Sequence, residues 1–230
     1  MIDKYREVLC RVSLFNGISH CDLAVMLDCL KPKTCKYRKE EMIACADDPF
    51  ESIGIILEGE AAVIKENAAG SRAMMTLLRP SDIFGEMAVF SGRPVWPASV
   101  VAKQTCAVLF IPRQNIVGEC SQTCARHRTM IFNMLKIISE KALMLNKKVE
   151  YLSIKSMRGK LCTFIMEQYK RRGSLTFMLP MNRNELADFL NVSRPSMSRE
   201  LCRLRDEGII DFHLSSVRVL NVELLKSMAE

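Results

Sequence analysis

Short apolar runs separated by turn residues fill the chain between about residues 33 and 112. The runs read ESIGIILEG, EAAVIKE, RAMMTLLRP, ASVVAKQ and TCAVLFIP, and turns such as Asp47-Asp48-Pro49 and Pro80-Ser81-Asp82 divide them. Many short strands with turns at intervals of about 8–12 residues are typical of an antiparallel sandwich or a barrel-like roll. Before them, residues 1–30 carry an apolar stripe at helical spacing, which predicts a short helical cap; it consists of Leu23, Met26, Leu27 and Leu30.

After Pro112 the apolar period becomes helical. Apolar residues then alternate at spacings of four and three, as Ile131, Leu135, Ile138, Ala142, Leu145, Val149 and Leu152. Such a narrow seam is typical of a coiled-coil pair, so we expect two copies of the chain to join along this helix. The alternative is a helix packed only on its own domain. Residues 153–157 follow as a predicted hinge.

Residues 181–210, MNRNELADFLNVSRPSMSRELCRLRDEGII, predict two short helices joined by a tight turn. Asn182 and Glu185 stand at capping-box spacing at the start of the first helix. Asn191 tolerates the left-handed conformation that ends it. Ser193 then caps a second helix, in which Pro195 lies inside the first turn, where a missing N–H costs least.

The second helix has an apolar inner stripe of Met197, Leu201 and Leu204 and a basic outer face. This pattern predicts a helix-turn-helix that reads DNA, and IIDFHLSSVRVL over residues 209–220 predicts a hairpin wing. The alternative is a helical hairpin with a solvated arginine face. The candidate DNA-binding residues are Ser193, Arg194, Pro195, Ser196, Arg199 and Arg203.

Charged residues are distributed unevenly along the chain. The net charge is +7, yet residues 151–205 hold 11 Lys+Arg against 4 Asp+Glu, which points to a polyanionic partner in this part. Charged or glycine residues interrupt every long apolar run, and MIDKYREVLC lacks the apolar core of a signal peptide. We therefore expect a cytoplasmic protein without membrane contact.

Together these segments resemble the CRP/FNR family of bacterial transcription regulators. IILEGEAAVIK, DIFGEMAVFSG and LADFLNVSRPSMSREL are similar to family segments, and the resemblance spans nearly the whole chain. It implies an α+β protein with an N-terminal cyclic-nucleotide-binding-like β-roll (1–120), a dimerisation helix (121–152) and a C-terminal winged helix-turn-helix (153–230). It also implies a homodimer that binds double-stranded DNA at inverted repeats, responds to a small-molecule effector and contacts RNA polymerase.

The resemblance further implies which effector to expect. In members that bind cyclic nucleotides, a Gly-Glu turn is followed by an Arg-Ser or Arg-Thr pair that holds the cyclic phosphate. Gly85 and Glu86 match this turn, but Trp96 and Pro97 stand at the expected Arg-Ser positions. A Trp offers one neutral donor where a guanidinium would give a charge-assisted bidentate contact, and Arg93 stands three residues early. We therefore predict an effector other than cyclic AMP.

The predicted effector pocket combines the Gly-Glu turn, the stretch after it and three residues of the long helix. Its members are Gly85, Glu86, Met87, Val89, Trp96, Pro97, Ala98, Ser99, Lys141, Leu145 and Asn146. This set favours an apolar or aromatic ligand with one polar end. Two alternatives stay open: the roll is filled by its own side chains, or Glu86 is only a structural turn residue.

Ten cysteines raise an alternative, a redox, thiol or iron–sulfur sensor of the same family. The N-terminal ones are 11, 8, 6 and 10 residues apart, no C-x2-C pair occurs, and Cys120 and Cys124 are four apart, which does not fit a cluster-binding pattern. Cys10 and Cys202 are candidates for a thiol switch. His20, His127 and His213 are isolated and offer neither a haem ligand set nor a catalytic base, so we expect no cofactor, metal or enzyme activity. A regulatory module without DNA contact is the remaining class.

Overall fold

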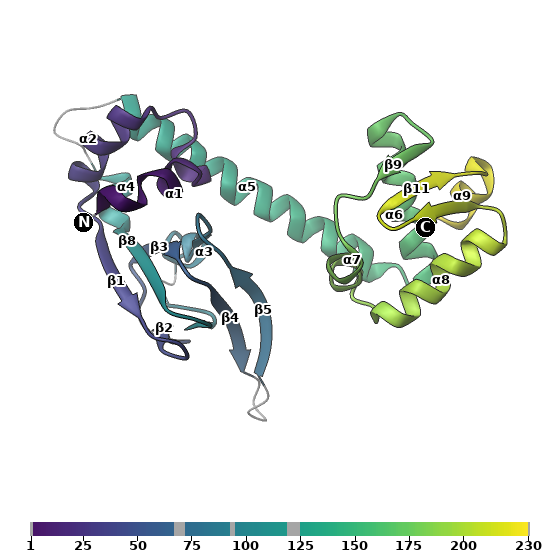
Figure 1. The fold of residues 1–230 in the computed structure, drawn as a ribbon, viewed down its shortest axis with the longest axis horizontal. Helices are drawn as coiled ribbons and strands as arrows, with labels where there is room; N and C mark the ends of the chain where they lie inside the picture. The colour runs from purple at the N-terminus through teal and green to yellow at the C-terminus, as the bar shows by residue number, and fades with distance from the viewer. Residues whose placement is uncertain (1, 67–71, 93–94, 119–124, 230) are drawn as a thin grey trace. The chain divides into compact units, whose positions relative to one another are not determined.

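A computed structural model describes residues 2–66, 72–92, 95–118 and 125–229 (Figure 1). The chain forms two compact units, 1–140 and 141–230. The boundary between them falls within one helix, α5 (Ala125–Ser153). The domain boundaries at residues 120 and 152 that were expected from the sequence stay a prediction.

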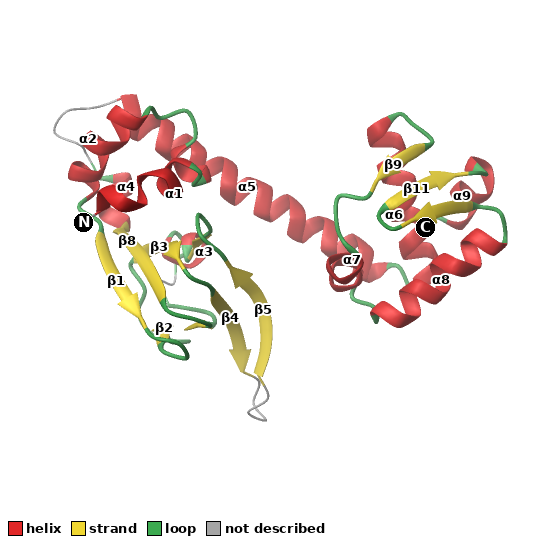
Figure 2. Ribbon diagram, viewed as in Figure 1, coloured by secondary structure: helices red, strands yellow, loops and turns green. Residues whose placement is uncertain are grey.

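The first unit is a β-roll with short helices, as the sequence predicted (Figure 2). One antiparallel sheet has the order β1-β8-β3-β6 and the other β2-β7-β4-β5. The strands of the first sheet are β1 (Lys33–Tyr37), β8 (Cys106–Pro112), β3 (Ser52–Glu58) and β6 (Ile83–Phe84). Those of the second are β2 (Met42–Ala44), β7 (Ser99–Ala102), β4 (Ala61–Glu66) and β5 (Arg72–Leu78).

The middle strands of the first sheet are buried on both faces. In β3, Ile53 and Ile55 pack into a cluster with the helices, whereas Ile56 packs into the cluster between the two sheets. Because successive side chains point to opposite faces, two covered faces explain a continuous apolar run without polar alternation. Gly54 completes this packing, since a Cβ there would lie 2.1 Å from Cζ of Phe84.

Helices cover the outer face of this sheet. They are the 3-10 helices η1 (Ile2–Tyr5) and η2 (Ser13–Phe15), α1 (Arg6–Cys10), α2 (His20–Leu30), α4 (Arg113–Val117) and the N-terminal part of α5. The predicted stripe of α2 is confirmed, with Leu23, Met26 and Leu30 buried and Leu27 packed against the same cluster. Ser19 caps this helix by accepting a hydrogen bond from the N–H of Asp22.

The second unit consists of helices around a small antiparallel sheet of order β10-β11-β9. Its helices are α6 (Met157–Arg172), α7 (Arg183–Leu190), α8 (Arg194–Asp206) and α9 (Val222–Met228). The strands are β9 (Thr176–Met178), β10 (Ile210–His213) and β11 (Ser216–Val219). One apolar cluster holds them together, and it includes Phe164, Leu190, Leu204 and Val217.

Candidate DNA-binding and effector sites

The first helix of the predicted pair is fixed at both ends by its own sequence. Oδ1 of Asn182 accepts hydrogen bonds from the N–H groups of Asn184 and Glu185, and Oε2 of Glu185 accepts one from the N–H of Asn182 at 2.9 Å. This confirms the capping box and satisfies donors that a helix start leaves unpaired. Asn191 ends α7 with φ 53°, as its residue type predicts.

The second helix, α8, begins at the predicted cap. Oγ of Ser193 accepts a hydrogen bond from the N–H of Ser196, and Pro195 lies in the first turn. Met197, Leu201 and Leu204 are buried in the cluster of the second unit. The inner stripe read from the sequence is therefore the packed face of this helix.

The opposite face of α8 is basic and open to solvent. Arg194, Arg199 and Arg203 are exposed. Ser193 and Pro195 are exposed as well, and Ser196 is half-buried. The guanidinium of Arg199 donates a hydrogen bond of 3.0 Å to Oγ of Ser196, which also accepts one of 2.8 Å from Ser193. This chain of hydrogen bonds holds Arg199 along the first turn of α8.

Three residues that the sequence analysis did not single out fasten α8 to α6. Arg158 donates from Nε to Glu200 at 2.7 Å, and its other two nitrogens bind both carboxylate oxygens of Glu207. Arg203 contacts the second oxygen of Glu200 at 3.2 Å. Arg158 lowers the pKa of Glu207 through its hydrogen bonds. The partners lie 42 and 49 residues from Arg158, so no local pattern indicates them.

The wing is a three-stranded sheet rather than the predicted hairpin alone, because β9 pairs with β11. Arg183 at the start of α7 holds the turn of the wing: it donates a hydrogen bond of 3.0 Å to the carbonyl of Leu214 and stacks on the ring of Phe212 at 5.0 Å. Burial lowers the pKa of Arg183. Leu214 at this turn has φ 52° and is 78% exposed.

The predicted dimer seam lies on α5 and is largely open in the single chain. Leu135, Leu145 and Val149 are exposed by 59%, 50% and 64%. Ala142 and Leu152 are also exposed, whereas Ile131 and Ile138 are half-buried and Ile138 packs against the core of the first unit. Most of the apolar residues of the predicted seam are therefore exposed to solvent in the single chain.

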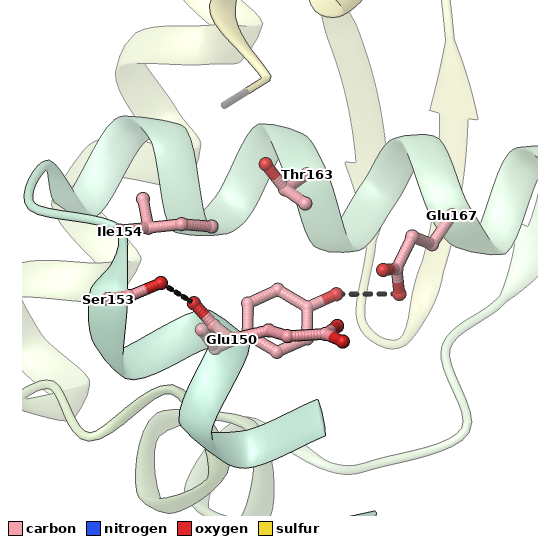
Figure 3. Close-up of a pocket in the computed structure, with 6 residues that line it drawn as sticks. Glu150, Ser153, Ile154, Thr163 and Glu167 are labelled. Carbon is pink, nitrogen blue, oxygen red and sulfur yellow. Dashed lines mark hydrogen bonds between the residues drawn. The ribbon is translucent and has the colours of Figure 1, made fainter. Parts of the chain in front are cut away.

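The last turns of α5 are bound into the second unit. Tyr151 is fully buried and donates a hydrogen bond of 2.7 Å to Glu167 of α6 (Figure 3). Lys147 forms an ion pair of 2.6 Å with the same carboxylate. Burial and Glu167 together raise the pKa of Tyr151. Residues 154–156 lie outside any helix, where the sequence predicted a hinge.

The Gly-Glu turn of the first unit takes a conformation that suits glycine. Gly85 has φ 87°, and Glu86 follows as the first residue of a short helix, α3 (Glu86–Val89). A Cβ on Gly85 would lie 2.4 Å from Cε1 of Phe50. The backbone of this turn is thus pressed against an aromatic cluster.

The residues of the predicted effector pocket differ in exposure. The buried members are Gly85, Glu86, Val89, Trp96 and Ala98, whereas Met87 and Pro97 are exposed. Ser99 accepts a hydrogen bond from the N–H of Ala46. Trp96 packs against Phe50 with ring centroids 4.6 Å apart and the ring planes tilted by 43°. Its Nε1 is buried and has no hydrogen-bond partner among the described residues. Lys141, Leu145 and Asn146 lie on α5 in the second unit, and Arg93 lies outside the described residues.

A redox or metal sensor would need cysteine or histidine side chains that lie close together. Sγ of Cys10 lies 3.4 Å from Nδ1 of His20, and Cys202 is half-buried on α8 in the other unit. Cys120 and Cys124 lie outside the described residues. Within the described ranges, no three His, Cys, Asp or Glu side chains are grouped to hold a metal ion. No described helix is long and apolar enough to cross a membrane.

Comparison with known proteins assigns both units. Residues 34–123 match the cyclic nucleotide-binding domain, and residues 159–228 match the Crp-like helix-turn-helix domain. A CRP-like cAMP-activated global transcriptional regulator of Mycobacterium tuberculosis is 20% identical over 229 residues, covering 97% of this chain and 99% of the relative.

Two solved structures share the fold. The catabolite activator protein of Thermus thermophilus is 21% identical, with 94% of this chain and 98% of that chain covered and a TM-score of 0.54. A mutant of CooA from Carboxydothermus hydrogenoformans is 16% identical, with 90% of each chain covered and a TM-score of 0.55.

Proposed function

This chain belongs to the CRP/FNR family of bacterial transcription regulators, and on that premise we propose a homodimer that binds inverted-repeat promoter sites and answers to a small molecule other than cyclic AMP. The chain is a DNA-binding transcription regulator with an effector-binding domain, and its family consists of regulators rather than enzymes. RNA polymerase is the proposed partner at the promoter.

The exposed basic face of α8 carries the DNA-binding proposal. Arg199 is the candidate for a base contact, because its guanidinium is exposed, always charged and held in place by Ser196. A bidentate contact of Arg with guanine is worth about 1–3 kcal/mol of discrimination. Ser193 and Ser196 lie at the start of the helix and are suited to phosphate, which positions the protein without specifying a sequence.

The proposed dimer joins two such helices through α5. The exposed residues of the seam supply the apolar surface, and an a/d pattern of this kind associates with a second copy. Two-fold symmetry then requires two half-sites whose centres lie about one helical turn, some 34 Å, apart on the duplex.

The effector proposal rests on the first unit. Trp96 and Pro97 replace the pair that holds a cyclic phosphate in relatives, and Trp96 packs among Phe50 and Phe84 instead of presenting a cation. An apolar or aromatic molecule suits such surroundings better than a cyclic phosphate. The Mycobacterium tuberculosis relative is described as cAMP-activated, so the two proteins differ in this proposal.

Arg199→Ala, compared with Arg172→Ala on matched and scrambled operators over a salt series, tests the readout. Loss of Arg199 is expected to reduce the difference in affinity between the matched and scrambled operators, because a contact to a base distinguishes one sequence from another. Loss of the exposed Arg172 is expected at most to weaken binding to both alike. Equal weakening on both operators by Arg199→Ala would show that this arginine only clamps phosphate.

A further inference from the structure

The second unit contains a groove of about 590 Å³ that none of the sites above uses. Met144 and Lys147 of α5 form one side, and Phe164, Gln168 and Arg171 of α6 form the floor and part of the rim. Phe189 of α7 lines it as well, together with the segment that leads into α7. Its volume lies in the range that small-molecule sites occupy, about 300–1,000 Å³.

The lining of the groove is mainly apolar. The rings of Phe164 and Phe189 lie 6.1 Å apart at their centroids, and Met144 of α5 is 58% exposed. Aromatic rings and methionine sulfur make favourable contacts with a flat apolar body. The floor therefore suits an aromatic or similarly flat group.

One polar atom in this lining lacks a partner. Gln168 is only 7% exposed, and its Oε1 is buried without a hydrogen bond from any described residue. A buried acceptor left unpaired is unfavourable, and a hydrogen bond from a ligand N–H or O–H that reaches it would remove this cost. Gln168, whose amide oxygen is unsatisfied among the described residues, is thus part of the wall of the groove.

The rim of the groove carries positive charge that is not neutralised. Glu167 is engaged by Lys147 at 2.6 Å and by the hydroxyl of Tyr151 at 2.7 Å, so its charge is compensated. Lys170 and Arg171 are exposed and form no ion pair within the described part of the chain. Two unpaired cations beside an apolar floor favour an anionic group at the mouth.

We propose that this groove binds a small amphipathic anion, with a flat apolar body against Phe164 and Phe189, a hydrogen-bond donor to Gln168, and a carboxylate facing Lys170 and Arg171. The groove shares no lining residue with the effector pocket predicted above, although both include residues of α5. Since its walls come from α5, α6 and α7, an occupant fastens the first helix of the helix-turn-helix to the end of α5.

Three probes of similar size separate the features of the proposed ligand. Indole-3-acetate carries the ring, the N–H donor and the carboxylate; indole-3-acetamide lacks the charge; and 1-naphthaleneacetate lacks the N–H. Calorimetric titration into the full-length protein measures each affinity. We expect indole-3-acetate to bind at one site per chain and more tightly than either analogue.

Lys170→Gln with Arg171→Gln tests the rim, and both side chains are exposed, so folding is not at risk. Its matched control is Lys155→Gln with Arg172→Gln, which removes the same charge from exposed positions outside the groove. The first pair is expected to weaken indole-3-acetate about tenfold and to leave indole-3-acetamide unchanged, because two charge-assisted contacts are lost. The control pair is expected to leave both affinities unchanged.

Gln168→Leu tests the proposed hydrogen bond to Gln168 through the ratio of the affinities for two ligands, which does not depend on the stability of the variant. In this variant, the preference of the protein for indole-3-acetate over 1-naphthaleneacetate is expected to disappear. Absence of saturable binding to the unaltered protein at millimolar concentrations would overturn the proposal. Equal loss of affinity in the rim and control pairs, or an unchanged affinity in the rim pair, would overturn it too, since the carboxylate would then be bound elsewhere.

Discussion

Replacing Arg158 by Ala removes a cation that Glu200 and Glu207 share. The side chain of Glu200 is only 11% exposed, and it would lose a 2.7 Å contact while keeping the 3.2 Å contact to Arg203. Removing one partner of a fully buried pair costs about 3–5 kcal/mol, and the remaining contact and the partial exposure of Arg158 reduce this here. We expect Arg158→Ala to lower the free energy of unfolding of the second unit by about 2–3 kcal/mol.

The chain offers an internal control for this experiment. Its single Trp, Trp96, lies in the first unit, so tryptophan fluorescence during urea unfolding follows that unit, whereas far-UV circular dichroism follows both. The loss is expected in the dichroism and not in the fluorescence. Adding Glu200→Gln to Arg158→Ala is expected to restore most of the stability, because the uncompensated charge is then gone. A cost below about 0.5 kcal/mol for Arg158→Ala, or no recovery in the double variant, would refute this account of the clamp.

Three further predictions concern the seam, acid stability and the wing. Leu145→Lys with Val149→Lys is expected to yield monomers that bind the operator weakly, because like charges then face each other, and an unchanged dimer in sedimentation would remove the seam. Arg158 holds the pKa of Glu207 below its ordinary value of 4.5, so this ion pair stabilises the fold above about pH 4.5, and the stabilisation is lost as the pH falls through the folded pKa. Arg158→Ala is therefore expected to weaken the fall of the urea midpoint of unfolding with decreasing pH in the acid range. An unchanged pH dependence would contradict the pairing. Arg183→Lys keeps the charge but loses the guanidinium over the Phe212 ring and its hydrogen bond to Leu214. We therefore expect about tenfold weaker operator binding and faster amide exchange around Leu214, whereas affinity equal to that of the unaltered protein would show that charge alone matters.

Local chemistry explains which parts of the fold could be predicted from the sequence. The capping box of Asn182 and Glu185, the left-handed Asn191 and the inner stripe of α8 depend on residues a few positions apart, and all three are confirmed. The run ESIGIILEG also predicted a strand, and its burial on both sides explains why polar residues do not alternate in it.

Contacts between distant residues could not be predicted in this way. Arg158 reads as one more charge on a helix, and only the packing of α6 on α8 reveals its two carboxylate partners. Strand β9 has three residues and is specified by its pairing with β11, not by a periodic pattern. The residues proposed for the effector pocket come from both units, so their joint role stays a prediction.

Selection of duplexes from a random pool, at fixed salt and with the unaltered protein beside Arg199→Ala, tests the central claim most directly. We expect the unaltered protein to enrich an inverted repeat whose half-site centres lie about one helical turn apart, with a conserved G·C pair in each half. Arg199→Ala is expected to enrich the same spacing with that pair relaxed. A pool without an inverted repeat, or an identical half-site for both proteins, would contradict the claim that a dimer reads DNA through Arg199 of α8.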